Sequence, residues 1–213
     1  MRLIPAILAE TRDDMERMVR VAETFTDYVQ VDFMDGRFVP MRSVSLQAVR
    51  DIAPAMRMEA HLMVKHPRGY LEALQSTGFE KVIFHVESAD QPMKVIERAR
   101  WFGLNVRLAI HPETPVDEID HLVEKTDGVL FLTVEPGSYG NEFVPDVLGK
   151  IKEFKGDHPD IPCGIDGGVK FENLDVVISA PIDVVTIGSG IFEADDPAKA
   201  YRELSQRIER MAA

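Results

Sequence analysis

Two aspartates stand near the ends of apolar runs that are typical of strands, where the functional groups of parallel barrels are found. Asp32 lies in the run at 28–33, and Asp166 directly follows the run at 162–165. These are the second and seventh such runs, so in a barrel they end on different sides of the mouth. Two carboxyls placed there can remove a proton from one face of a ligand and return it to the other. We therefore interpret Asp32 and Asp166 as an acid–base pair.

Glycine loops follow the last two runs, at 165–169 (IDGGV) and 187–191 (IGSGI). Barrels commonly build a phosphate site at these strand ends, and glycine lets the backbone approach a ligand closely. The sequence therefore predicts a phosphate site there. A strand-end aspartate can also cap a loop or pair with a cation, but the glycine pair behind Asp166 favours a functional role. A third glycine loop, at 135–143, is typical of a lid over the ligand or of an ordinary turn.

One histidine shares the expected mouth with the two aspartates. His61 lies near the end of the third run, at 58–63, where an imidazole can bind a metal or transfer a proton. We expect His66, His121 and His158 at the surface. Other polar residues at strand ends are His85, Glu87, His111, Thr133 and Glu135.

Eight short apolar runs alternate with longer amphipathic stretches along the chain. Unbroken apolar runs are typical of parallel strands buried on both faces, and the stretches between them are typical of crossover helices. The pattern therefore predicts one (β/α)8 barrel over residues 1–213. An open doubly wound sheet is the alternative, which the lack of a GxGxxG motif after the first run weakens. Strands are expected at 2–8, 28–33, 58–63, 81–86, 106–110, 128–133, 162–165 and 182–187. Helices are expected at 11–23, 45–52, 67–75, 91–102, 116–125, 144–154, 171–179 and 197–211, with the weakest pattern at 45–52.

The composition excludes some classes of partner. The formal net charge of −12 argues against nucleic acid, whose binding depends on basic patches, but not against a small phosphate held by a few backbone amides. The single cysteine, Cys163, excludes an intrachain disulfide and fits a reducing compartment. No segment has the length of a membrane span or the pattern of a signal peptide. We expect a cytoplasmic protein with no nucleic-acid or membrane partner.

Six sequence blocks, in order along nearly the whole chain, resemble the ribulose-phosphate 3-epimerase family. They are VDFMDGRFVP (31–40), AHLMVKHP (60–67), FHVE (84–87), LTVEPGSYG (132–140), IDGGV (165–169) and IGSGIF (187–192). The resemblance implies a barrel isomerase of carbohydrate metabolism, in the pentose phosphate pathway. Such an enzyme interconverts D-ribulose 5-phosphate and D-xylulose 5-phosphate by two-base proton transfer through an enediolate.

The resemblance also implies roles for particular residues. Asp32 and Asp166 would be the acid–base residues and, together with His61, ligands of a divalent metal: zinc, iron, manganese or magnesium. Met34 and Met63 would line the mouth near the substrate, a small-molecule sugar phosphate. Barrels of this class often associate through their helices, so we expect a homo-oligomer. The phosphate would be held by Gly137, Gly140, Gly167, Gly168, Gly188 and Ser189.

The sequence departs from the family pattern around the expected metal. Gln30 stands where the family has a histidine that is the fourth ligand. A glutamine offers an amide oxygen in place of the imidazole that zinc and similar ions prefer, so we expect the metal to be altered, weakly bound or absent. Ala6 stands where the family has a serine that contacts substrate. Arg37 and Met41 also replace different, usually polar residues.

Three interpretations of the function remain open. The chain is an epimerase with a weak, altered or absent metal; or it is an epimerase or isomerase for a related ketose phosphate, such as a ketohexose 6-phosphate; or it binds a sugar phosphate without catalysis. An aldolase of this fold would need a Schiff-base lysine. Lys65 and Lys170 lie past the strand ends, which disfavours that reaction.

Overall fold

The computed structural model describes residues 1–136 and 141–212. Eight parallel strands close into a barrel in chain order, with β8 hydrogen-bonded to β1. The predicted (β/α)8 barrel is therefore confirmed, and the doubly wound alternative is wrong. The strands are β1 (Arg2–Ile7), β2 (Tyr28–Met34), β3 (Arg57–Met63), β4 (Lys81–His85), β5 (Asn105–Ile110), β6 (Val129–Leu132), β7 (Cys163–Asp166) and β8 (Val184–Ile187).

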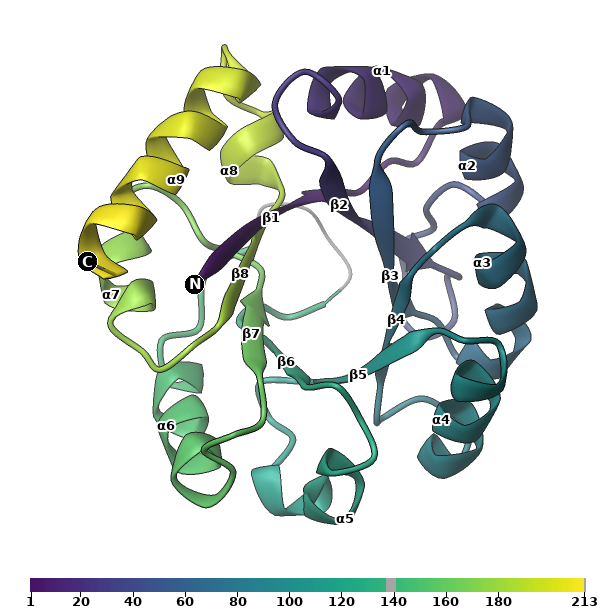
Figure 1. Ribbon diagram of the computed structural model, residues 1–213, viewed down its shortest axis with the longest axis vertical. Helices are drawn as coiled ribbons and strands as arrows, with labels where there is room; N and C mark the ends of the chain where they lie inside the picture. Colours follow the sequence, from purple (N-terminus) through teal and green to yellow (C-terminus); the bar gives the residue numbers. More distant parts are fainter. Residues whose placement is uncertain (137–140, 213) are drawn as a thin grey trace.

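Helices surround the barrel and connect its strands (Figure 1). Each expected helix is present, but two of them begin as a separate 3₁₀ turn, a common way for a helix to start. The sequence analysis missed one element, the single-turn α8 between β8 and the last helix. The helical elements are α1 (Arg12–Ala22), α2 (Leu46–Ile52), η1 (Pro67–Gly69), α3 (Leu71–Thr77), α4 (Pro92–Trp101), η2 (Val116–Glu118), α5 (Asp120–Val123), α6 (Val147–Asp157), α7 (Leu174–Ile178), α8 (Ser189–Phe192) and α9 (Pro197–Ala212).

Local capping explains why the weakly patterned α2 forms. The Ser45 side chain accepts a hydrogen bond from the backbone N–H of Ala48, which satisfies one of the free donors at the helix start. Val49 and Ile52 then lie on one buried face of the helix. This short helix is therefore held by its cap and by packing rather than by a long amphipathic pattern.

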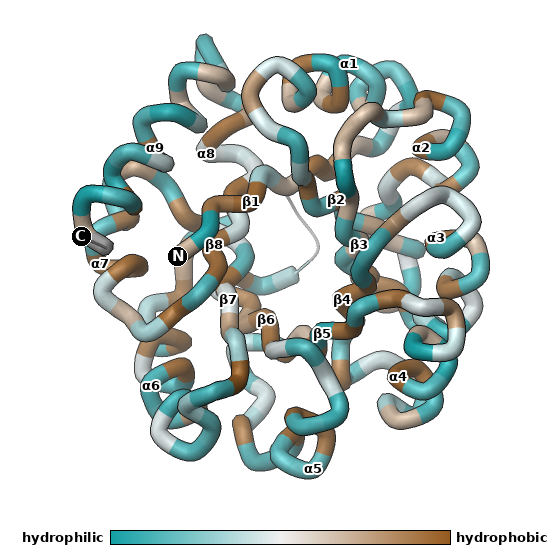
Figure 2. The backbone as a smooth tube through the Cα atoms, viewed as in Figure 1, coloured by the Kyte–Doolittle hydropathy of each residue, from teal (hydrophilic) through white to brown (hydrophobic). Residues whose placement is uncertain are grey.

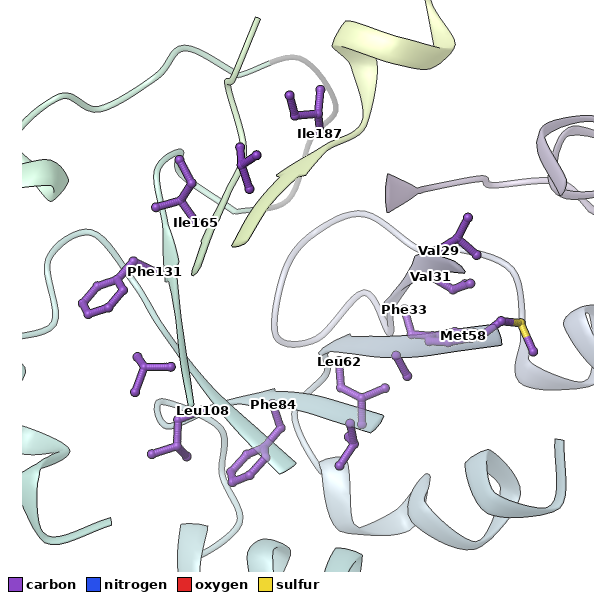
Figure 3. Packing of buried hydrophobic residues seen from close by; sticks show 14 of the residues in the cluster. Val29, Val31, Phe33, Met58, Leu62, Phe84, Leu108, Phe131, Ile165 and Ile187 are labelled. Atoms are coloured by element: carbon purple, nitrogen blue, oxygen red, sulfur yellow. The ribbon is translucent and has the colours of Figure 1, made fainter. Parts of the chain in front are cut away.

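The strands place alternate side chains inside and outside the barrel. In β2, Val29, Val31 and Phe33 belong to the main hydrophobic core. Figure 3 shows these three among the buried side chains that pack around the strands, and Figure 2 shows hydrophilic residues over much of the outer helices. Along β2, Gln30 and Asp32 alternate with these three apolar residues and are buried too. The two polar residues therefore face the barrel interior.

The strand register sets the floor of the mouth. Asp32 of β2 is paired with His61 of β3, and Asp166 of β7 is paired with Thr186 of β8. All the strands are parallel, so their carboxyl ends open at the same mouth. In the described part of the chain, no helix is long and apolar enough to cross a membrane.

Candidate active site

A cavity opens at the carboxyl-terminal mouth of the barrel, and it collects most of the predicted site residues. Its described lining includes Asp32, Met34, His61, Met63, Asp166, Gly167, Gly168, Gly188 and Ser189. Gln30 lies among them without lining the cavity, and it is fully buried. The predicted phosphate ligands Gly137 and Gly140, and with them part of the expected lid, lie outside the described residues.

Asp32, His61 and Asp166 form a compact cluster on the cavity floor. The Nδ1 atom of His61 is 3.1 Å from Asp166 Oδ2 and 3.5 Å from Asp32 Oδ1. One ligand atom from each residue lies within 4.8 Å of the other two. One nitrogen and two carboxylate oxygens at these separations fit a single divalent cation, with positions left for water or substrate.

Gln30 bridges the two carboxylates of this cluster. Its Nε2 donates to Asp32 Oδ1 at 2.8 Å and to Asp166 Oδ2 at 2.6 Å. A carboxamide nitrogen carries one N–H for each carboxylate, and the Thr186 hydroxyl donates to Gln30 Oε1 at 3.5 Å. Gln30 thus holds the same two groups that a cation would bridge. To act as a metal ligand, the Gln30 amide must rotate by half a turn so that Oε1 faces the carboxylates. Its Nε2 would then face the Thr186 hydroxyl, which can accept a hydrogen bond as well as donate one.

Burial and mutual contact shift the pKa values of this cluster. Burial raises the pKa of Asp32, and the nearby Asp166 carboxylate adds to that effect. Burial alone would lower the pKa of His61, but hydrogen bonds to Asp166 and Asp32 outweigh it and raise the pKa to about 9. An imidazolium at His61 therefore balances the carboxylates at neutral pH when no cation is bound.

A second chain of polar contacts starts behind His61. Its Nε2 lies 3.0 Å from Nε2 of His85, and Nδ1 of His85 lies 3.4 Å from Glu87 Oε2. Glu87 in turn accepts from the backbone N–H of His111 at 2.8 Å and from the Thr114 hydroxyl. The sequence places His85, Glu87 and His111 at strand ends but does not by itself connect them to His61. The adjacency of the third and fourth strands was the available signal.

Apolar side chains close one side of the mouth. Leu8, Met34, Val39 and Met63 form a small buried cluster, against which Met41 packs. The departure from the family pattern at Met41 therefore enlarges an apolar wall. Ala6 also lines the cavity, where it adds no polar group.

The Gly167–Gly168 pair meets a steric demand at the end of β7. Both residues have positive φ, of 107° and 65°. A Cβ on Gly168 would lie 2.8 Å from the Cα of Phe143, so glycine is required there whether or not phosphate binds. The two lysines considered for a Schiff base, Lys65 and Lys170, are exposed and do not line the described cavity.

The profile of the ribulose-phosphate 3 epimerase family matches residues 2–192. The chain belongs to this family. The ribulose-phosphate 3-epimerase of Schizosaccharomyces pombe is 31% identical and covers 97% of this chain and 93% of that protein. The cytoplasmic isoform of ribulose-phosphate 3-epimerase from Oryza sativa subsp. japonica is 30% identical and covers 98% of this chain and 94% of that protein.

Solved structures with the same fold include proteins outside the ribulose-phosphate 3 epimerase family. The 3-hexulose-6-phosphate synthase from Salmonella typhimurium has a TM-score of 0.73 at 19% identity, covering 99% of both chains. KGPDC from Streptococcus mutans, solved in complex with D-R5P, has a TM-score of 0.74 at 15% identity, covering 98% of this chain and 97% of that one. At these identities the likeness shows the barrel fold alone.

Proposed function

We propose that this family member is the epimerase for D-ribulose 5-phosphate and D-xylulose 5-phosphate, with Asp32 and Asp166 as its two bases. The observation that carries the proposal is the position of these carboxyls. They come from β2 and β7, line one cavity and bond to the same amide nitrogen. Two carboxyl groups that line one cavity from different strands can reach opposite faces of one carbon of a ligand bound there.

Epimerisation requires one carboxylate to remove a proton and one carboxylic acid to return a proton to the other face. Burial raises the pKa of Asp32, so Asp32 is better suited to hold a proton before the substrate arrives. Asp166 is then the first base in one direction of the reaction. In the reverse reaction Asp32 is the base and Asp166 the acid, because the proton of the other epimer lies on the opposite face of the carbon.

The surrounding residues position the pair and limit water. The two N–H bonds of Gln30 fix the carboxylates relative to each other, and the apolar wall with Met34 and Met63 covers the reacting carbon. A divalent cation held by Asp32, His61 and Asp166 would supply positive charge beside the oxygens on which negative charge develops. Of zinc, iron, manganese and magnesium, the imidazole of His61 favours zinc or iron.

The phosphate end of the ligand is assigned to the glycine loops. Gly167 and Gly168 line the cavity directly after Asp166, and Gly188 and Ser189 line it after β8. The three glycines present backbone to the cavity without a side chain in between, which suits a phosphate bound by N–H groups. A sugar phosphate bound there places its carbon chain over the carboxyl pair.

Exchange of solvent deuterium into D-ribulose 5-phosphate, followed by NMR with and without added zinc, tests this function. We expect deuterium at the third carbon and formation of D-xylulose 5-phosphate. Asp166→Asn should abolish exchange while the sugar phosphate still raises the melting temperature. Asp13→Asn, an exposed aspartate of α1, is the matched control and should exchange normally.

The same assay separates the alternatives. Exchange with a ketohexose 6-phosphate but not with D-ribulose 5-phosphate would establish a different substrate. A rise in melting temperature without exchange of any ketose phosphate would establish a binding protein. Loss of both binding and exchange in Asp166→Asn would give Asp166 a structural role and contradict the two-base mechanism.

We also propose that the chain acts in the cytoplasm as a homo-oligomer. The buried free thiol of Cys163 is consistent with a reducing compartment. Large apolar side chains remain exposed on the outer helices, including Trp101 on α4 and Met211 on α9, and such side chains favour association. Sedimentation of the purified protein tests the oligomeric state, and a monomer at all concentrations would contradict it.

A further inference from the structure

A second group of metal-ligating side chains lies beside the catalytic cluster, at the ends of β4 and β5. His85 ends β4, Glu87 follows two residues later, and His111 directly follows β5. One ligand atom from each lies within 4.8 Å of the other two. None of the three lines the described part of the catalytic cavity, so this group is separate from the floor formed by Asp32 and Asp166.

Two of its nitrogen atoms are buried without a hydrogen-bond partner among the described residues. They are Nδ1 of His85 and Nε2 of His111. His85 is fully buried, and its Nδ1 lies 3.4 Å from Glu87 Oε2 without the geometry of a hydrogen bond. A buried polar atom that lacks a partner destabilises the fold unless an ion or water satisfies it. Both nitrogens belong to the group that contains the Glu87 carboxylate, which is the arrangement a cation would satisfy.

The carboxylate is already fixed in the orientation that a cation requires. Glu87 Oε1 accepts from the backbone N–H of His111 and from the Thr114 hydroxyl, which leaves Oε2 facing Nδ1 of His85 at 3.4 Å. Two ligands bound to one tetrahedral ion at about 2.0–2.1 Å lie about 3.4 Å from each other. His85 and Glu87 therefore stand at ligand spacing, and His111 offers a ligand atom within 4.8 Å of theirs.

We propose that His85, Glu87 and His111 form a second divalent transition-metal site. Two imidazoles and one carboxylate suit zinc or cobalt, with a fourth position left for water. The Phe38 ring packs on both imidazoles, with its centroid 4.9 Å from that of His85 and 5.5 Å from that of His111. This ring covers the two imidazoles, which favours a structural role at the β4–β5 edge.

The contact between the two histidine rings couples this site to the catalytic cluster. A hydrogen bond between Nε2 of His61 and Nε2 of His85, which lie 3.0 Å apart, needs a proton on one of the two nitrogens. A cation on Nδ1 of His85 leaves that proton on His85, so a neutral His61 carries its own proton on Nδ1, facing the carboxylates. A cation in the catalytic cluster needs the opposite arrangement. The two sites should therefore compete, and removing the catalytic carboxylates should not weaken the second one.

Cobalt binding in a chain that lacks the catalytic carboxylates tests the site. In Asp32→Asn/Asp166→Asn we expect one equivalent of Co²⁺, with the visible absorption of a low-symmetry site. Adding His111→Asn should weaken this binding by at least the ~10–100-fold that even loss of an outer partner causes. Adding His121→Asn, which changes an exposed histidine of α5, should leave it unchanged.

Two results would overturn the proposal: no Co²⁺ binding in the Asp32→Asn/Asp166→Asn chain, or binding that His111→Asn does not weaken. Circular dichroism and cooperative melting establish that each variant is folded. If the double variant does not fold, Asp32→Asn alone provides the background, and Glu87→Gln replaces His111→Asn if that substitution disturbs the fold. The readout is metal binding without turnover, so failure here leaves the epimerase proposal untouched.

Discussion

Replacing Gln30 by histidine should strengthen metal binding at the catalytic cluster. The present side chain makes two hydrogen bonds to carboxylates, at 2.8 Å to Asp32 and 2.6 Å to Asp166. Hydrogen bonds to charged groups contribute about 1.5–3 kcal/mol each. A cation that enters between the carboxylates must displace both, at a cost of about 3–6 kcal/mol, which corresponds to roughly 10²–10⁴-fold in affinity. Gln30→His removes this cost and adds an imidazole ligand.

We therefore expect Gln30→His to bind zinc at least about 100-fold more tightly than the parent chain. Competition against a chromophoric chelator measures the affinity, and metal content after dialysis gives the stoichiometry. Gln47→His, at an exposed glutamine of α2, controls for a surface histidine. Unchanged affinity in Gln30→His would refute the reasoning.

Gln30→Ala separates the two roles of the amide. If the amide competes with the cation, alanine should raise the zinc affinity, because both displaced hydrogen bonds are already gone. If the amide turns over and ligates through Oε1, alanine should lower the affinity. The sign of the change therefore decides which end of Gln30 faces a bound metal.

Three further predictions concern the scaffold. Gly168→Ala should lower the free energy of unfolding by about 2–5 kcal/mol, because φ is positive there and the Phe143 backbone is close. Thermal melting measures this loss. The control Gly149→Ala, at a position with open space around it, should not lower the melting temperature. Burial raises the pKa of the Cys163 thiol to about 11, so the native chain should not react with a thiol reagent at pH 8, while the unfolded chain reacts with one equivalent. The Asp127 carboxylate accepts hydrogen bonds from the Val106 N–H and from Arg100. Burial alone would raise the pKa of Asp127, but these bonds outweigh it and lower the pKa below 3.8. Asp127→Asn should therefore cost about 1 kcal/mol at pH 7. That difference should vanish as the pH falls through the lowered pKa, and a constant difference in denaturant titrations at low pH would contradict it.

The barrel could be predicted because its signal is local and repeated. Each strand is a short apolar run, and each crossover is an amphipathic stretch, so small errors at the ends did not change the topology. The strand expected at 182–187 is the shorter Val184–Ile187, for example. The one-turn helix α8 was not predicted because four residues, one of them a glycine and with another glycine just before them, show no helical period. Its position depends on the barrel that surrounds it.

That Asp32, His61 and Asp166 share one mouth could also be predicted, but their contacts could not. Strand alternation places Gln30 and Asp32 on one face, and the order of the runs brings Asp166 and His61 to the same mouth. Which atoms meet depends on register across strands far apart in sequence. The bond from Gln30 to Asp166 is one such case, since it joins side chains 136 positions apart in the chain.

Gln30 shows most clearly how contacts that the sequence cannot predict change the interpretation of a residue. From the sequence, a glutamine in place of a histidine is a lost ligand, and the expected result is a weaker metal site. In the structure the same amide has one donor for each carboxylate and a Thr186 hydroxyl that can partner its other end in either orientation. The two carboxyl groups are thus held together by hydrogen bonds from one amide and by the charge of His61. The substitution therefore supplies a way to hold Asp32 and Asp166 together when no cation is bound. Under the proposed mechanism, a change in metal affinity then need not bring an equal loss of proton transfer.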